Sequence, residues 1–532
     1  MRSRVNAAQS GFSRVERALL RLTRMKLSRL RLVAVVVPLL LAACGQSSES
    51  TLGAIGPGGD SRAIPSTGSG REALPGETYG KLIENDWVDT SQQPTSTFGI
   101  DVDTGSYSLM RRDVQAKRAP NQDGVRPEEY INYFDYGYAP PTDGKPFAVH
   151  LDGAPSVFGQ DYHLVRVAMQ GAPIDEAQRQ HANLVFLVDV SGSMGDPNKL
   201  PLVKYTLQQL VSRLRPTDTL AIVTYAGSSS VLLPPTPVVD KDKITAGIEA
   251  LTTGGGTNGE GGIRKAYELA EQAKVQDQRG PGINRVVLCT DGDFNVGLTG
   301  GDLVKLIEEK RDTGVTLTTL GFGQGNYNDR EMERLADHGN GNYAYVDSKD
   351  EADRIVGKRF VSMLQVIAKD TKIQIDFKPE VVSKYRLVGY ENRVLAKEDF
   401  EDDKKDSGDL GAGHNVTAFY EVALTPAAKQ NQLATAELAT VKLRYKLPSS
   451  DQSELLERSL PMSALASSFD AAPASFRFAA ATAEYAEILR RSKHSEGARF
   501  DDVLGILRAT AGEDNDKKEL IELVESAKTF WK

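Results

Sequence analysis

The chain has 532 residues, and its 72 acidic side chains outnumber 64 Lys and Arg, which gives a net charge of −8 at pH 7. This length suffices for about three domains, and the 40% hydrophobic, 26% charged and 7% aromatic residues are ordinary for a soluble globular protein. The acidic balance argues against nucleic acid as a partner and against electrostatic attachment to anionic lipid.

The N-terminus carries the pattern of a secretory signal. Residues 32–41 are apolar, but such a stretch is too short to span a bilayer as a helix. Lys26, Arg29 and Arg31 precede it, and Leu-Ala-Ala-Cys follows at residues 41–44, so a basic flank, a short apolar core and small residues stand in the expected order. The end of this segment resembles a bacterial lipobox, which predicts cleavage before Cys44 and acylation of its thiol; a chance Cys after an ordinary signal is the alternative.

Residues 1–43 are therefore expected to be a lipoprotein signal peptide, with translation starting at Met1 or Met25. Residue 45 is Gly rather than the Asp associated with inner-membrane retention. The predicted location is the cell envelope, lipid-anchored in the outer membrane and facing the periplasm, with the lipid as the only membrane contact. Without residues 1–43, which hold nine basic and one acidic side chain, the chain has 55 basic and 71 acidic side chains and a net charge of −16.

Residues 44–76 are rich in Ser, Gly and Pro and are expected to be a flexible tether. The region that follows, 77–180, is predicted to contain a strand, a helix over 106–117, a second helix over 126–134 and two alternating strands within 147–169. We expect Asp103 to cap the first of these helices.

The sequence Asp-Val-Asp-Thr-Gly-Ser at 101–106 looks like motifs of two enzyme classes. A haloacid-dehalogenase-type phosphatase also needs a downstream Lys and a carboxylate pair after further strands, and none is arranged that way. An aspartic protease needs two aspartates close together in an apolar setting, whereas the second Asp-Ser-Gly, at Asp406, lies in a charged run. Neither enzyme is favoured.

The central feature of the chain is a short apolar run that ends in polar residues. Residues 184–188 are Leu-Val-Phe-Leu-Val, which predicts a strand buried on both faces, as in a parallel sheet. Asp189 ends the run, and Ser191 and Ser193 follow. Ligand sites on such sheets lie beyond the carboxyl ends of the strands, and carboxylate and hydroxyl oxygens suit Mg²⁺, Mn²⁺ or Ca²⁺. The alternative is a Ser/Gly-rich turn in which Asp189 is only a cap.

Two later segments favour the metal interpretation. Thr257 follows three glycines in the loop 251–258, and the second apolar strand, 285–289, is followed by Thr-Asp-Gly with Asp291 at its centre. Asp-x-Ser-x-Ser, a separated Thr and a strand-end Thr-Asp-Gly resemble the metal-ion-dependent adhesion site of von Willebrand factor A (VWA) domains. Residues 96–104, 125–134 and 389–393 further resemble the YfbK-like group of bacterial VWA-domain lipoproteins.

The resemblance implies a metal site made of Asp189, Ser191, Ser193, Thr257 and Asp291, holding Mg²⁺ or else Mn²⁺ or Ca²⁺. Such a ligand set leaves one coordination position open, which an Asp or Glu of an envelope or extracellular partner protein could fill. We therefore expect a metal-dependent protein–protein interaction and no enzymatic activity. Two alternatives stay open: an envelope scaffold whose metal site is structural or non-functional, and a metal-dependent hydrolase.

The VWA domain is expected to span residues 181–368. Its predicted helices cover 200–214, 244–251, 261–274, 303–310, 329–337 and 351–368, and its remaining strands 220–225, 230–233, 315–322 and 343–346. Strands alternating with helices predict an α/β, doubly wound, mostly parallel Rossmann-like sheet. The glycines at 254–262 lack the Lys-Ser/Thr of a P-loop, so no nucleotide is expected, and Cys289 is expected to be a small core residue.

The segments on both sides of the VWA domain are predicted to form one further unit. Within 369–465, strands are expected over 372–377, 416–423 and 439–445. These and the strands before the VWA domain are too few to fold well separately, so we expect one β-sandwich built from both flanks, with the VWA domain inserted in it. Residues 466–532 carry helical periodicity over 476–491, 500–510 and 517–529 and are expected to form a small helical unit or to pack on the sandwich.

Overall fold

The computed structural model describes residue 74 and residues 76–159, 161–277, 279–292, 301–430 and 432–531. The predicted signal peptide 1–43, the predicted acylation site Cys44 and nearly all of the predicted tether 44–76 lie outside these residues. The described residues belong to one compact unit. None of its helices within these ranges is both long enough and apolar enough to cross a membrane.

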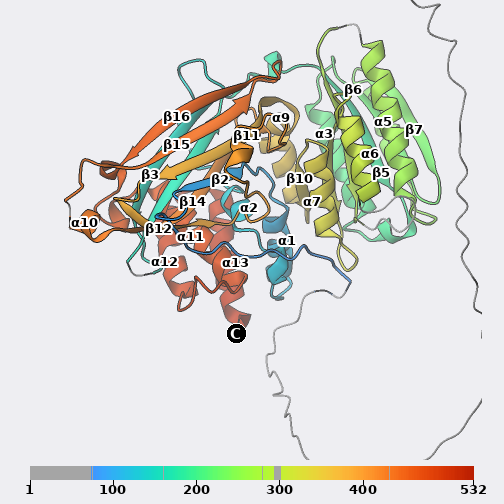
Figure 1. The fold of residues 1–532 in the computed structure, drawn as a ribbon. Coiled ribbons are helices and arrows are strands. Elements are labelled where there is room, and N and C mark those ends of the chain that lie inside the picture. Colours follow the sequence, from blue (N-terminus) through green and yellow to red (C-terminus); the bar gives the residue numbers. More distant parts are fainter. Residues whose placement is uncertain are drawn as a thin grey trace, which may run out of the picture. The chain divides into compact units, whose positions relative to one another are not determined.

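Six strands form the sheet of the VWA domain, in the order β10-β9-β8-β5-β6-β7 (Figure 1). All neighbours are parallel except β6 and β7. Every residue of the central strands β5 and β8 is buried, as expected for a sheet covered on both faces. The bounds are β5 Ala182–Asp189, β6 Thr219–Tyr225, β7 Ser229–Pro237, β8 Ile283–Thr290, β9 Thr316–Phe322 and β10 Tyr343–Val346.

Helices cover both faces of this sheet, which confirms the doubly wound arrangement. Helices α3 (Leu200–Arg213) and α4 (Lys241–Glu249) bury their apolar side chains against one face. Helices α5 (Gly259–Gln276), α6 (Gly301–Arg311) and α7 (Asp329–His338) cover the other.

The end of the domain differs from the expected single helix over 351–368. Helix α8 (Lys349–Arg354) runs into a π-helical turn, Ile355–Arg359, and then into α9 (Phe360–Leu364). Strand β11 begins at Val366, so the expectation of a helix through residue 368 is wrong. Ile367 and Ala368 are buried in the core of the sandwich, and this burial outweighs the helical periodicity that continues through them.

Two sheets form the predicted sandwich, and the VWA domain is inserted between β4 and β11. One sheet has the order β1-β12-β14-β4-β3, and the other β13-β11-β15-β16 with β2 also paired to β11. Val167 and Met169 of the first sheet share a core with Ile373 and Ile375 of the second. The bounds are β1 Val88–Asp89, β2 Thr95–Gly99, β3 Phe147–Pro155, β4 His163–Gly171, β11 Val366–Phe377, β12 Val382–Val388, β13 Leu410–Gly411, β14 Asn415–Leu424, β15 Glu437–Lys446 and β16 Ser453–Pro461.

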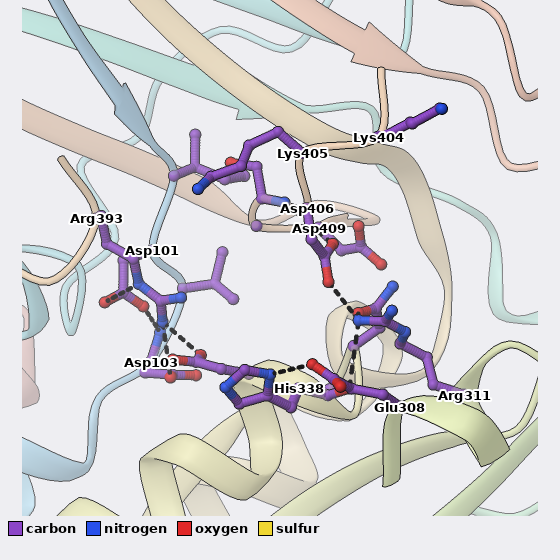
Figure 2. Close-up of a pocket in the computed structure, with 17 residues that line it drawn as sticks. Asp101, Asp103, Glu308, Arg311, His338, Arg393, Lys404, Lys405, Asp406 and Asp409 are labelled. Atoms are coloured by element: carbon purple, nitrogen blue, oxygen red, sulfur yellow. Dashed lines mark hydrogen bonds and ion pairs between the residues drawn. The ribbon is translucent and has the colours of Figure 1, made fainter. Parts of the chain in front are cut away.

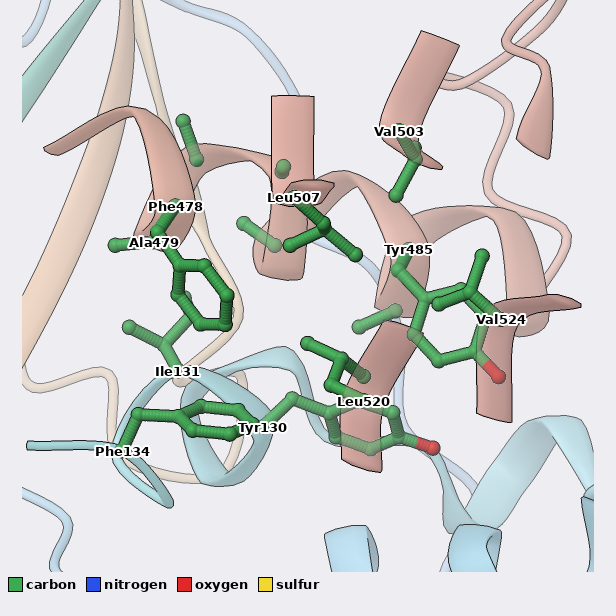
Figure 3. Close-up of a cluster of buried hydrophobic side chains, with 14 of the residues drawn as sticks. Tyr130, Ile131, Phe134, Phe478, Ala479, Tyr485, Val503, Leu507, Leu520 and Val524 are labelled. Carbon is green, nitrogen blue, oxygen red and sulfur yellow. The ribbon is translucent and has the colours of Figure 1, made fainter. Parts of the chain in front are cut away.

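The C-terminal helices pack on the sandwich and also hold the N-terminal helices. In Figure 3, Tyr130 and Phe134 lie among side chains of all three C-terminal helices, including Phe478, Leu507 and Leu520. Phe419 of the sheet belongs to the same cluster, so this cluster covers the outer face of β14. The helices are α1 (Gly105–Gln115), α2 (Pro127–Ile131), α11 (Ala474–Leu489), α12 (Phe500–Thr510) and α13 (Asn515–Phe530), with a short α10 (Pro426–Lys429) between β14 and β15.

Helix α1 connects this cluster to the VWA domain. Leu109 of α1 packs with Tyr343 and Tyr345 of the edge strand β10. The prediction that Asp103 caps α1 is wrong. The helix follows Thr104, which makes no side-chain cap. The Asp103 carboxylate instead accepts a 2.7 Å hydrogen bond from the Tyr343 backbone N–H. The carboxylate that a helix start would use is therefore used to join two parts of the fold.

Candidate metal centre

Asp189 ends strand β5 with a completely buried carboxylate. One oxygen, Oδ1, accepts the backbone N–H of Ser191 at 2.9 Å, and the other, Oδ2, accepts the hydroxyl of Thr290 at 2.8 Å. Thr290 ends the neighbouring parallel strand β8 and also accepts the Gly292 N–H at 3.1 Å. Both carboxylate oxygens are thus oriented by the ends of two adjacent strands.

Ser191 and Ser193 follow Asp189 in the turn before α3. Their hydroxyl oxygens lie 3.0 Å apart. Ser191 is buried and Ser193 is exposed, so the pair extends from the buried carboxylate to the surface. Two hydroxyls at this spacing can offer lone pairs to one ion.

The glycine-rich loop that carries Thr257 is held against this turn by backbone hydrogen bonds. Gly192 donates to the Gly255 carbonyl at 3.1 Å, and Gly254 donates to the Val190 carbonyl at 2.8 Å. Gly255 has a φ of +88°, a conformation that favours glycine. Thr257 itself is buried, so the loop brings a fourth predicted ligand to the end of the sheet as a fixed part of the fold.

Asp291, the fifth predicted ligand, is completely buried and bound by two residues that the motif did not reveal. The Lys199 ammonium lies 3.0 Å from Asp291 Oδ2, and the amide of Asn326 donates to the same oxygen at 3.0 Å. Lys199 also donates to Asn326 Oδ1 at 2.9 Å. Lys199 precedes α3 and Asn326 lies in the loop after β9, and no local sequence signal indicates that either reaches Asp291.

Asp189 and Asp291 place two buried carboxylates at this end of the sheet, and the Lys199 ammonium is the counter-ion of Asp291. Burial and the nearby charge of Asp291 raise the pKa of Asp189, because both disfavour its ionised form. Carboxylate and hydroxyl oxygens are hard ligands suited to Mg²⁺, Mn²⁺ and Ca²⁺, so the residues fit such an ion. Within the ranges that the structure covers, no three His, Cys, Asp or Glu side chains form a metal-binding group, and an ion here would depend on hydroxyls together with the two carboxylates.

The two histidines of the VWA domain lie away from this end of the sheet. His181 lies just before the first residue of β5, whereas Asp189 is the last residue of that strand. The Nε2 of His181 lies 2.7 Å from Asp277 Oδ2. His338 ends α7, with Nδ1 2.8 Å from Glu308 Oε1. Cys289 is completely buried in β8, and burial raises the pKa of its thiol, as expected for a core residue.

A cavity of about 450 Å³ lies elsewhere, between the VWA domain and the sandwich (Figure 2). Arg393 reaches Asp101 at 3.4 Å and Asp103 at 3.6 Å, while Arg311 pairs with Asp406 at 2.5 Å. The aspartates of the two enzyme-like motifs are therefore bound by different arginines rather than paired with each other. They are ion-pair partners at the junction of the two parts.

Comparisons with known proteins agree with this architecture. Residues 183–358 match the model of the von Willebrand factor type A domain, residues 362–530 match the C-terminal model of the uncharacterized protein YfbK, and residues 74–166 match a von Willebrand factor model. The uncharacterized protein YfbK of Escherichia coli (strain K12) is 38% identical over 472 residues, which cover 84% of this chain and 80% of that protein. The chain belongs to the YfbK family. Its VWA domain supports a role in protein–protein interaction.

More distant similarities accompany the YfbK match. The uncharacterized protein sll0103 of Synechocystis is 26% identical over 307 residues, covering 56% of this chain and 69% of that protein. A solved von Willebrand factor type A structure from Catenulispora acidiphila covers 73% of this chain and 91% of its own, with a TM-score of 0.42 and 15% identity. The ArnB paralog VWA2 from Sulfolobus acidocaldarius covers 72% and 98%, with a TM-score of 0.36 and 15% identity.

Proposed function

We propose that this YfbK-family protein uses its VWA domain to bind a divalent cation and, through that cation, a carboxylate of a partner protein. The observation that carries the proposal is the pair of buried aspartates, Asp189 and Asp291, beside two hydroxyls 3.0 Å apart. Asp189, Ser191, Ser193, Thr257 and Asp291 would hold Mg²⁺, or else Mn²⁺ or Ca²⁺.

The charges explain why a partner carboxylate would be preferred. When bound, the ion supplies two positive charges, which the two aspartates balance, and the Lys199 ammonium lies 3.0 Å from one of these aspartates. The site would then carry a net positive charge, which attracts an anionic group. Ser193 is exposed, so an approaching Asp or Glu side chain would meet the ion on the surface side.

The proposed setting is the cell envelope. It rests on the signal-like segment 1–43 and on Leu-Ala-Ala-Cys at 41–44, whose acylation at Cys44 would anchor the protein in the outer membrane, facing the periplasm. Labelling of cells with a fatty-acid analogue should mark the wild-type chain and not the Cys44→Ser variant. Equal label in both would contradict the lipid anchor and leave the metal proposal untouched.

Metal binding is tested by calorimetry with the full chain. We expect binding of one Mg²⁺ per chain, and we expect Asp189→Ala to abolish it because the ion would lose a charged ligand. Asp196→Ala is the matched control: Asp196 lies in the same turn but is exposed and should leave the affinity unchanged. If Asp189→Ala bound Mg²⁺ as tightly as the wild type, the assignment would fail.

The Lys199–Asp291 ion pair favours one alternative, in which the ammonium serves as the permanent counter-ion and the site only stabilises the fold. That alternative predicts no Mg²⁺ binding by the wild type. A partner-binding site instead predicts that envelope proteins captured with Mg²⁺ are released by chelator. A captured partner whose Asp or Glu is changed to Asn or Gln should then bind more weakly, whereas metal-dependent turnover of a substrate would favour a hydrolase.

A further inference from the structure

The segment 76–79, which we call the strap, lies directly on the loop that holds Asp291. Thr78 donates its backbone N–H to the Tyr327 carbonyl at 2.9 Å, and its own carbonyl accepts the Asp329 N–H at 3.0 Å. These two bonds form a parallel β-bridge between Thr78 and Asn328. The strap is therefore paired with Asn328, the last residue of the connection between β9 and α7 (residues 323–328).

Glu77 gives the strap a second, stronger hold on this loop. Its side chain is 1% exposed, and its Oε1 accepts the backbone N–H of Gly325 at 3.0 Å. Arg112 of α1 binds both carboxylate oxygens, at 2.9 and 2.8 Å, and the Tyr79 hydroxyl donates to Oε2 at 2.6 Å. A buried carboxylate held in this bidentate way is a rigid acceptor for the loop amide.

The same loop reaches the candidate metal site. Asn326, next to Gly325, donates to Asp291 Oδ2 at 3.0 Å and accepts from Lys199 at 2.9 Å. The backbone of the strap also lies close to this loop. A Cβ on Gly76 would lie 2.5 Å from the Gly325 carbonyl oxygen, and the φ of Gly76, +92°, favours glycine at this position. A short chain of contacts thus runs from Arg112 through Glu77 and the loop to Asp291.

We propose that Glu77 is a positioning residue of the metal site: by fixing the Gly325 amide, it holds Asn326 and hence Asp291 in the orientation that binds the ion. The inference rests on the proposed metal binding. In this role Glu77 makes the N-terminal flank part of the interaction site. Displacement of the strap would then weaken the binding of the ion and, with it, the binding of the partner carboxylate. Groups that orient metal ligands affect metal affinity by about 10- to 100-fold when they are removed.

The test separates positioning from stability. Glu77→Ala removes the acceptor of the Gly325 amide and should weaken Mg²⁺ binding by the full chain about tenfold. Glu77→Gln can keep that acceptor while losing the ion pair with Arg112, so it should be less stable yet bind Mg²⁺ within about threefold of the wild type. Gly76→Ala should weaken binding without changing any charge, because its Cβ pushes on the Gly325 carbonyl.

Asp113→Asn is the matched control. Asp113 is buried and lies 3.0 Å from the same guanidinium of Arg112, but no hydrogen bond joins it to the loop in the part of the chain that the structure covers. We expect Asp113→Asn to lose stability and to keep its Mg²⁺ affinity. Unchanged affinity in Glu77→Ala, or equal losses in Glu77→Ala and Asp113→Asn, would overturn the positioning role.

Hydrogen exchange distinguishes this failure from failure of the proposed function. Amide exchange over residues 323–328, measured without metal, should rise in Glu77→Ala and stay at the wild-type level in Asp113→Asn. If the wild type bound no Mg²⁺, the metal proposal would fail. Amide hydrogen exchange alone would then test whether Glu77 fixes the loop. Exchange that is unchanged in Glu77→Ala would refute that hold whatever the metal result.

Discussion

Replacing Arg126 by Met should strongly destabilise the protein. The Arg126 side chain is 1% exposed. It donates to Asp329 Oδ2 at 2.7 Å and to Asp329 Oδ1 at 3.0 Å, and it also binds Glu129. Arg126 belongs to the N-terminal flank and Asp329 to the start of α7, so this pair joins the VWA domain to the rest of the fold.

The expected loss comes from the carboxylates that would be left behind. The side chains of Asp329 and Glu129 are both completely buried. Removing one partner of a buried ion pair typically costs about 3–5 kcal/mol, because the other charge stays in a low-dielectric surrounding. Among the described residues, Asp329 would retain the hydrogen bond from the Tyr343 hydroxyl, at 2.7 Å. Methionine nearly fills the space of the arginine stem, so packing should contribute little of the loss.

Urea unfolding followed by circular dichroism measures this change through the free energy of unfolding. A double-mutant cycle with Asp329→Asn isolates the pair. We expect Arg126→Met to lose about 3–5 kcal/mol and the double variant to lose at least about 1 kcal/mol less than the sum of the two single changes. A loss below about 1 kcal/mol for Arg126→Met, or strictly additive losses, would refute the reasoning.

Two further predictions address the site and the pH dependence of stability. Thr290→Val keeps the side-chain shape but removes the donor to Asp189 Oδ2, so calorimetry should show Mg²⁺ affinity about tenfold lower; an unchanged affinity would mean that this hydrogen bond does not orient the ligand. Burial, with a smaller contribution from Glu487, raises the pKa of Glu484 from 4.5 to about 8. Between these two pKa values the folded protein keeps a proton that the unfolded chain has lost. The free energy of unfolding therefore falls as the pH rises from about 4.5 to about 8. In Glu484→Gln this fall should be smaller, so the unfolding midpoints of variant and wild type should diverge between about pH 4.5 and about pH 8; parallel pH profiles would contradict the assignment.

The residues of the candidate site fall into two groups by how far sequence can identify them. The apolar run 184–188 predicts a strand that is buried on both faces. The position of Asp189, Ser191 and Ser193 at the carboxyl end of that strand was therefore predictable. Lys199 and Asn326 are ordinary polar residues of a turn and a loop. Their roles depend on the close approach of the β9–α7 connection to Asp291, which no local pattern encodes.

The sandwich shows the same division. Strands β14 and β15 were predictable from the alternation of apolar and polar residues, although β14 is buried on both faces in the structure. Strand β12 was missed because it includes Arg386, which is buried where an apolar residue would be expected. Arg386 is accommodated there because Glu421 lies 2.6 Å away on the paired strand and Glu487 lies 3.3 Å away on α11. These partners are separated in sequence and become neighbours only when the helix packs on the sheet.

By itself the sequence determined the alternation of strands and helices, the insertion of the VWA domain between two flanks, and the order of the oxygen-bearing residues along the chain. These follow from hydrophobic periodicity and from short motifs, which are local properties. Only the tertiary structure decided where the last helix of the domain ends, which arginines bind which buried carboxylates, and that Glu77 lies on the loop beside Asp291. Such features depend on which distant groups are desolvated together, and the energy of a buried charge is set by its neighbours in space rather than in sequence.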